Sequence, residues 1–174
     1  SNNTAAGFEA LNANTTGTQN VAVGAGALDA NTTAANNTAV GYRAAYTQEG
    51  ASAQNTAVGM SALYTNNGGE YNTALGYYSM QGATTGDYNT AIGASTMVAA
   101  NTGSYNNAVG YLALTANTSG AQNNAVGAGS LDANTTGSYN TAMGHDSLSA
   151  NTTASNNTAF GHSALALNTT GDTN

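Results

Sequence analysis

Apolar and polar residues alternate in a short sequence motif that recurs along the whole chain. Residues 55–59 read Asn-Thr-Ala-Val-Gly, and equivalent words open at Asn3, Asn20, Asn37, Asn55, Asn72, Asn89, Asn106, Asn123, Asn140 and Asn157. Every step is 17 residues except the 18-residue step that begins at Asn37, and a further Asn stands in register at Asn174. So short a period is typical of a solenoid, because one repeat cannot bury its apolar side chains without stacking on its neighbours.

The most regular positions form a predicted structural ladder, in which the opening Asn is position 1. Position 3 is Ala and position 5 is Gly in all ten copies, while position 4 is apolar, from Ala6 to Phe160. Position 9 is Leu or Met in every copy but one, where it is Ala45. In one copy the ladder residues are Asn55, Ala57, Val58, Gly59 and Leu63.

This pattern predicts short strands rather than helices, because a Gly in every repeat, with Asn and Thr around it, disfavours a helix. Side chains alternate along a strand, so Thr56 and Val58 are expected on one face and Asn55, Ala57 and Gly59 on the other. The Leu at position 9 predicts a second strand facing the first, and the polar stretch at residues 14–17 predicts a turn. The sequence therefore predicts an all-β, parallel β-solenoid (β-roll or β-helix) of ten 17-residue rungs, one array over residues 1–174 cut from a longer fibre.

Stacked rungs would place like residues in columns about 4.8 Å apart. The Asn column is expected to pair its amides along the axis, unless each Asn satisfies only its own turn. Burying one Val and one Leu per rung gains about 3 to 6 kcal/mol, whereas ordering each residue costs about 1.5 kcal/mol. Further packing is needed, so we expect the Ala and Gly face to lie against another chain or a second wall of the same solenoid.

Charge excludes several partners. The net charge is -7, Arg43 is the only basic side chain, and there is no Cys. Nucleic acid and anionic membranes both require Lys and Arg, so neither is an expected partner. No apolar run approaches the roughly 20 residues of a membrane span, so no membrane insertion is expected.

The repeat Asn-Thr-Ala-Val-Gly-x-x-Ala-Leu at residues 55–63, with close variants at 20–28 and 157–165, resembles repeats of phage-type tail-fibre shafts and bacterial surface fibre proteins. More loosely, it is similar to the head repeats of trimeric autotransporter adhesins. The resemblance implies a structural shaft segment of an extracellular fibre or filament, on a virion or cell surface. Copies of the chain itself, as an end-to-end polymer or a homotrimer, and surface glycans are the implied partners.

The sequence contains no recognisable catalytic motif, so neither enzymatic activity nor a cofactor is expected. His145 and His162 share position 6 in successive repeats and are the candidate metal ligands. The alternative is that they are stacked rings, because the same position holds Phe8, Tyr42 and Tyr77 elsewhere. The acidic residues share no single position, so no calcium ladder is expected; they are Glu9, Asp29, Glu49, Glu70, Asp87, Asp132, Asp146 and Asp172.

Two further columns suggest surface functions. Tyr71, Tyr88, Tyr105 and Tyr139 share position 17, where they would either hold sugars or stiffen the stack as a packed ladder. Asn-x-Ser/Thr glycosylation motifs recur at position 12, where a glycan is expected to project outward. These candidate sites are Asn14, Asn31, Asn117, Asn134, Asn151 and Asn168.

The alternative function is a ligand-binding solenoid that recognises polysaccharide or ice through arrays of Thr and Tyr. Thr38, Thr56, Thr73 and Thr90 share position 2, but Asn107 and Asn124 interrupt their column. In the 18-residue copy, Gln48-Glu49-Gly50 replaces the usual polar word, and the extra residue is expected in an outer bulge or longer turn.

Overall fold

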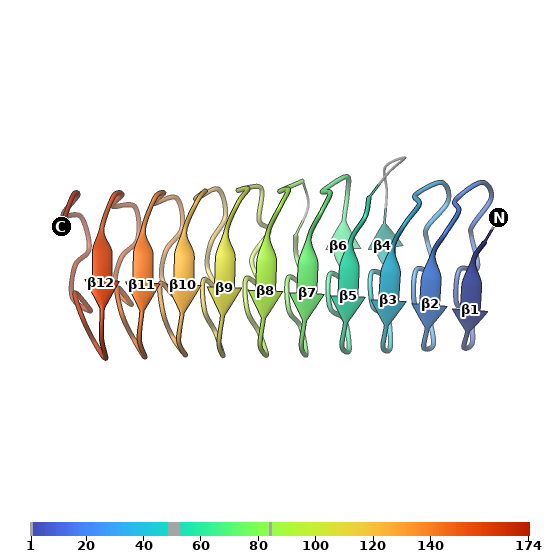
Figure 1. The fold of residues 1–174 in the computed structure, drawn as a ribbon, viewed down its shortest axis with the longest axis horizontal. Coiled ribbons are helices and arrows are strands. Elements are labelled where there is room, and N and C mark those ends of the chain that lie inside the picture. The colour runs from blue at the N-terminus through green and yellow to red at the C-terminus, as the bar shows by residue number, and fades with distance from the viewer. Residues whose placement is uncertain (1, 49–52, 84) are drawn as a thin grey trace.

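The chain forms a rod of stacked, parallel rungs. The computed structural model describes residues 2–48, 53–83 and 85–174. One three-residue strand from each repeat joins a ten-stranded sheet that runs the length of the rod, with the two ends of the chain at its opposite ends (Figure 1). The strands are β1 (Thr4–Ala6), β2 (Val21–Val23), β3 (Thr38–Val40), β5 (Thr56–Val58), β7 (Thr73–Leu75), β8 (Thr90–Ile92), β9 (Asn107–Val109), β10 (Asn124–Val126), β11 (Thr141–Met143) and β12 (Thr158–Phe160).

Each strand pairs with the equivalent strand of the next repeat, so that residues at the same repeat position lie opposite each other. Ala57 lies opposite Ala74, and the 18-residue step is absorbed without a slip, since Ala39 lies opposite Ala57. The predicted parallel β-solenoid with a 17-residue repeat is therefore confirmed. Among the described residues, no helix has the length and apolar character needed to cross a membrane.

The interior face of the sheet carries alanine, not valine. Ala57 is fully buried, whereas Val58 is partly exposed and Val23 is 39% exposed. The assumption that the position-4 side chain fills the core is wrong. The rung is narrow, and its interior is already occupied by a column of Leu and Met at position 9, so only a methyl group fits on the facing wall.

The hypothesis of a second wall is confirmed, because the Ala face packs against position 9 of the same chain. This wall is built mainly from turns, so the predicted second strand is wrong for most repeats. Position 9 adopts a left-handed conformation (Leu63 φ 50°), which turns the chain instead of extending it. Within the described ranges, strands on this wall occur only as the parallel pair β4 (Thr47–Gln48) and β6 (Thr65–Asn66).

Backbone hydrogen bonds still join the turns of successive rungs. Leu28 N donates to Ala44 O at 3.1 Å, and Arg43 N donates to Ala25 O at 2.9 Å. Rungs are thus bonded to one another around their perimeter and not only through the sheet. Glu49 and Gly50, two of the three residues in the stretch where a bulge is predicted, lie outside the described residues.

The Gly at position 5 is required by both conformation and space. Gly59 has φ 133°, a region that L side chains rarely adopt, and a Cβ built there would lie 2.5 Å from the carbonyl oxygen of Gly76 in the next rung. The close stacking of the bends therefore depends on a residue without a side chain.

Candidate functional site

The interior holds a continuous ladder formed by the opening asparagines. Asn72 Oδ1 accepts the backbone N–H of Asn89 at 2.9 Å, and Asn72 Nδ2 donates to the carbonyl of Gly86 at 2.8 Å. The link from Oδ1 to the next N–H recurs at every step from Asn20 to Asn157, and all these asparagines are at most 2% exposed. The predicted Asn ladder is confirmed with one difference: the main link between rungs joins an amide oxygen to a backbone N–H, not one amide to another.

The position-12 asparagines form a second inner ladder, and this one does pair amides. Asn134 Nδ2 donates to Asn117 Oδ1 at 2.9 Å and to Gly137 O at 3.0 Å, and Asn151 Nδ2 donates to Asn134 Oδ1 at 2.9 Å. A glycan on Nδ2 would break these bonds and would have no room in the interior.

The expected outward projection of the six glycosylation candidates is therefore wrong for Asn31, Asn117, Asn134 and Asn151, which are fully buried. Asn14 and Asn168 are partly buried. The exposed motifs lie elsewhere, just before the opening word, at Asn2, Asn36 and Asn156. The recurring Asn-Thr-Thr sequence suggested a turn on the surface. A recurring Asn, however, also allows the amides of successive rungs to pair inside the rod, and this is what the structure has.

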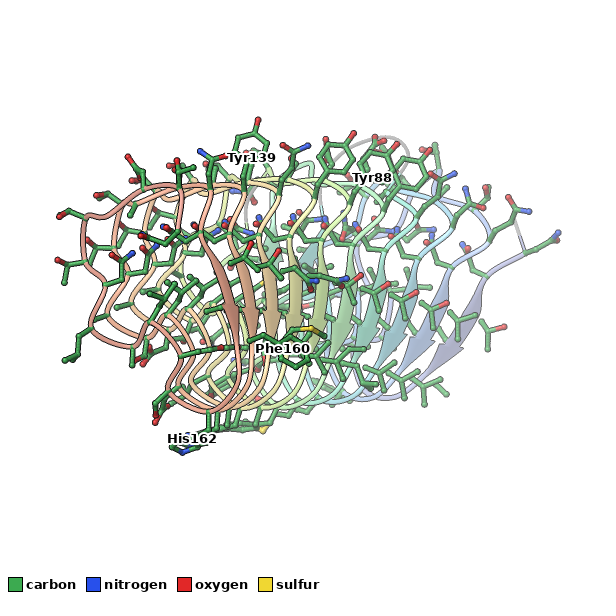
Figure 2. All side chains as sticks on the ribbon, turned by 60° about the vertical axis from the view of Figure 1, so that its left-hand side comes forward. Tyr88, Tyr139, Phe160 and His162 are labelled. Carbon is green, nitrogen blue, oxygen red and sulfur yellow. The ribbon has the colours of Figure 1, made fainter. Side chains whose placement is uncertain are left out.

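Three tyrosines of position 17 form a stacked column on one edge of the rod. The ring centroids of Tyr71 and Tyr88 are 4.7 Å apart, those of Tyr88 and Tyr105 are 5.0 Å apart, and neighbouring planes are within 4° of parallel. Partial burial of Tyr88, together with its tyrosine neighbours, raises its pKa. The packed ladder is confirmed for these three rings, whose shared faces are not free to stack on a sugar. Tyr139 lies further along the same edge (Figure 2).

Of the two histidines, His162 lies on a different edge, near the corner that follows the sheet (Figure 2), and His145 occupies the same position in the preceding repeat. Their rings stack at 5.2 Å and 6°, as expected for one more aromatic pair. His145 Nδ1 is 3.0 Å from Asp146 Oδ2, and His162 Nδ1 is 3.0 Å from Ser163 Oγ. In the described part of the chain, no three His, Cys, Asp or Glu side chains are grouped to hold a metal ion.

No family model, curated protein or solved structure matches this chain. The surfaces of the rod itself therefore provide the evidence for its function. Two of them, an outer apolar face and a charged hollow, were not identified from the sequence.

The outer face of the ten-stranded sheet is uncharged and rich in exposed apolar side chains. It consists of positions 2 and 4 of every repeat, and none of these residues is charged. Its most exposed apolar members are Val21, Val23, Leu75, Ile92 and Phe160. Phe160 is 80% exposed and extends from the sheet face in Figure 2. The sequence correctly predicted that side chains alternate between the two faces of the strand, but the exposed face, with the position-4 side chains, was wrongly expected to form the core.

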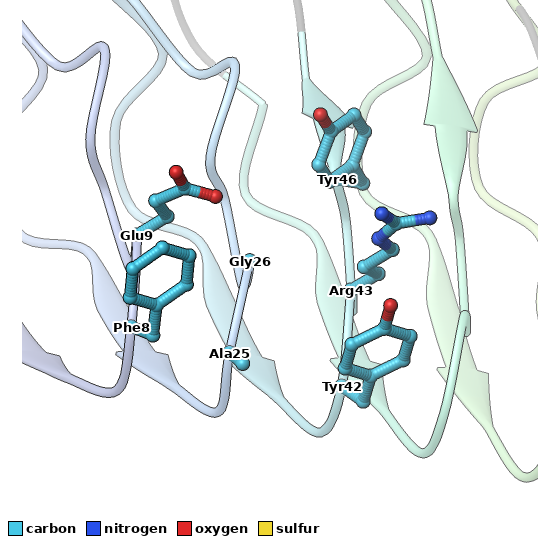
Figure 3. A pocket seen from close by; sticks show the side chains of 7 residues that line it. All are labelled: Phe8, Glu9, Ala25, Gly26, Tyr42, Arg43 and Tyr46. Atoms are coloured by element: carbon cyan, nitrogen blue, oxygen red, sulfur yellow. The ribbon is translucent and has the colours of Figure 1, made fainter.

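A shallow, open hollow of about 120 Å³ lies beside the first three rungs, next to Arg43. Its lining residues are Phe8, Glu9, Ala25, Gly26, Tyr42, Arg43 and Tyr46. Figure 3 shows Ala25 and Gly26 between Phe8 and Glu9 on one side and the two tyrosines and Arg43 on the other. No motif search would have found this site, since its residues come from three different repeats.

Proposed function

We propose that the chain is a structural shaft segment of an extracellular fibre or filament, on a virion or cell surface, whose role is to set length and stiffness. The observation that carries the proposal is the in-register stacking of every repeat on the next. Each rung adds one level, about 4.8 Å, to the rod. The proposal assigns no catalytic role to the chain.

Stiffness is supported by hydrogen bonds along the axis. Main-chain bonds join the sheet and the turns, the ladder of opening asparagines links each rung to the next, and the position-12 asparagines add amide pairs between some rungs. Bending the rod would stretch these bonds on one side. Because the amides are buried, a broken bond would leave unpaired polar groups without water, at a cost of about 1–3 kcal/mol each.

The outer sheet face supports lateral assembly with copies of the same chain, as in a homotrimer. A three-residue strand is about 10 Å long and ten strands span about 43 Å, so this face covers roughly 430 Å² in projection. Its apolar part is mainly the position-4 column, because position 2 is Thr or Asn in nine of the ten repeats, so about half of this area is apolar surface of the kind that often mediates binding. The net charge of -7 opposes self-association, but the face itself carries no charge and repeats at the same spacing in every copy.

The test is to place charges on this face. Replacing Val40, Val58 and Val109 together by Glu puts three carboxylates on the outer sheet face without touching the core, since all three side chains are partly exposed. The wild-type chain is expected to be an oligomer by light scattering, and the variant a folded monomer by light scattering and circular dichroism.

The matched control adds the same charge elsewhere. Gln19, Gln54 and Gln122 are exposed, each directly before an opening Asn, and replacing all three by Glu should leave the oligomer intact. A wild-type monomer at high concentration, or equal dissociation of both variants, contradicts assembly through the sheet face.

Ice recognition gains little support from the geometry. Thr38, Thr56, Thr73 and Thr90 do point outward, but the neighbouring column at position 4 is apolar and not a second row of Thr. The Thr column itself is also interrupted by Val21. Glycan binding, the other part of the alternative, is favoured by the hollow at Arg43.

A further inference from the structure

We infer that the hollow at Arg43 is a binding site for an acidic sugar, a pyranose ring that carries a carboxylate. The site goes beyond the proposed shaft function, and it depends on neither the sheet face nor the oligomeric state. It lies on the surface of the first three rungs and is shown in Figure 3.

The hollow exists because small residues interrupt a column of large ones. Position 6 reads, in order, Phe8, Ala25, Tyr42, Met60, Tyr77, Ala94, Tyr111, Ala128, His145 and His162. Where two rings occupy successive rungs of this column, as in the histidine pair, their centroids are 5.2 Å apart. Phe8 and Tyr42 belong to rungs two levels apart, about 9.6 Å. The space over Ala25 between them therefore has the thickness of one more ring.

Gly26 widens the same gap at position 7. A Cβ built on Gly26 would lie 3.2 Å from Arg43 Cγ, so even Ala would crowd the side of the hollow that Arg43 lines. Glu9 and Arg43 occupy this position in the rungs on either side. The gap thus has aromatic rings as its walls and the small residues Ala25 and Gly26 as its floor. The carboxylate of Glu9 lies on one side and the guanidinium of Arg43 on the other.

Arg43 is available to an anionic ligand. Its guanidinium carbon lies 5.2 Å from the ring centroid of Tyr42 and 5.4 Å from that of Tyr46, which holds the side chain beside the hollow. The side chain is exposed, and the described residues provide it with no ion pair. The nearby carboxylate of Asp29 raises the pKa of Tyr46. In a chain of net charge -7, this is the one point with a basic side chain to attract an anion.

The chemistry of the lining matches a carboxylated pyranose. A guanidinium binds a carboxylate through two parallel hydrogen bonds, and the carboxylate of Glu9 can accept hydrogen bonds from hydroxyl groups. Aromatic rings offer apolar surface to the C–H faces of a sugar. A phosphate group fits less well, because its charge of about -1.5 to -2 would lie near Glu9 with only one base to offset it.

Another gap in the column serves as an internal control. Ala94 lies between Tyr77 and Tyr111 with no Arg or Lys beside it, since Arg43 is the only one in the chain. Filling a gap is compatible with the backbone, because position 6 already holds Tyr at three places. The substitution Ala25→Tyr therefore blocks the proposed site, and Ala94→Tyr makes the same change where no binding is expected.

The experiment is a titration of the full chain with methyl β-glucuronide, followed by the NMR signals of the tyrosine rings, with methyl β-glucoside as the uncharged comparison. We expect saturable binding of the glucuronide in the millimolar range, weakened at least tenfold by Arg43→Gln and by raised salt. The glucoside should bind at least tenfold more weakly. Ala25→Tyr should abolish binding, and Ala94→Tyr should leave it unchanged.

Each contrary result overturns a stated part of the proposal. No saturable shift in the wild-type chain removes the site, and equal binding of glucuronide and glucoside removes the role of Arg43. Unchanged binding in Ala25→Tyr places the sugar elsewhere. Circular dichroism of each variant checks folding, and if Ala25→Tyr does not fold, Arg43→Gln alone decides the outcome. None of these results bears on whether the rod assembles through its sheet face.

Discussion

The inner Asn ladder makes a specific prediction, because two equivalent asparagines differ in how many partners their removal leaves unpaired. Asn72 and Asn123 both open a repeat, both are 1% exposed, and each accepts a backbone N–H of the following rung. Among the residues that the structure describes, Asn72 is the only one whose side chain donates to the carbonyl of Gly86. The carbonyl of Gly137, by contrast, accepts from Asn123 and also from the position-12 Asn of its own rung.

The difference arises because position 12 is Ala83 in the rung of Asn72 and Asn134 in the rung of Asn123. Replacing Asn72 by Ala leaves two buried groups unpaired, an N–H and a carbonyl, which costs about 2–6 kcal/mol at about 1–3 kcal/mol per group. Replacing Asn123 by Ala leaves one unpaired group, because Asn134 still donates to Gly137. We expect Asn72→Ala to be the more destabilising by about 1–3 kcal/mol.

Urea unfolding followed by circular dichroism measures both variants against the wild-type chain. Asn67→Ala is the control, since Asn67 is exposed in a turn, and we expect its effect to be within about 0.5 kcal/mol of zero. Because a repeat array can unfold in parts, hydrogen exchange of the Asn89 and Asn140 amides should report the local loss in each variant. Equal losses for Asn72→Ala and Asn123→Ala would refute the partner count, and a loss no larger than that of the control would refute the ladder as a source of stability.

Three other predictions test the fold. Gly59→Ala and Gly161→Ala should each incur about 1–3 kcal/mol of backbone strain, but only Gly59→Ala also clashes with the next rung, so its melting temperature should fall further; equal losses would argue against the close stacking at this bend. Burial raises the pKa of Asp132, so the native chain binds this proton more tightly than the unfolded chain and loses stability as the pH rises above about 4. Thermal unfolding should therefore show Asp132→Asn more stable than the wild-type chain at pH 7 but not at pH 3, and the reverse order would contradict this sign. When the chain is produced in a host that attaches N-linked glycans, peptide mapping of the folded product should find a glycan at Asn36 but not at Asn134, and a modified Asn134 in folded protein would contradict the inner ladder.

The periodicity of the sequence was sufficient to predict the stack. Equivalent residues such as Ala57 and Ala74 recur at one spacing, and parallel pairing in register is the arrangement that lets every repeat make the same contacts. The stacked rings of the histidine pair follow from the same rule, because a shared repeat position becomes a shared column. For such columns, the sequence is enough to identify neighbours.

The direction in which a column points could not be read in this way. Alternation places Ala57 and Val58 on opposite faces but does not say which face is inside, and hydrophobicity favoured the wrong one. Left-handed conformations at Leu63 and its equivalents were also unexpected, because Leu has no local preference for them. Such a conformation is held only by the packing of the rungs above and below.

The sequence by itself determined that this chain is a rod of parallel rungs with like residues in register, because a strict short repeat stacks best upon itself. Tertiary structure alone decided the cross-section of the rod. A 17-residue rung encloses too little space for two rows of large side chains, so Ala lies opposite Leu and the buried amides of Asn bond to backbone groups that water cannot reach. Val, Thr and the aromatic residues are left on the outside, where the uncharged sheet face and the hollow beside Arg43 are formed.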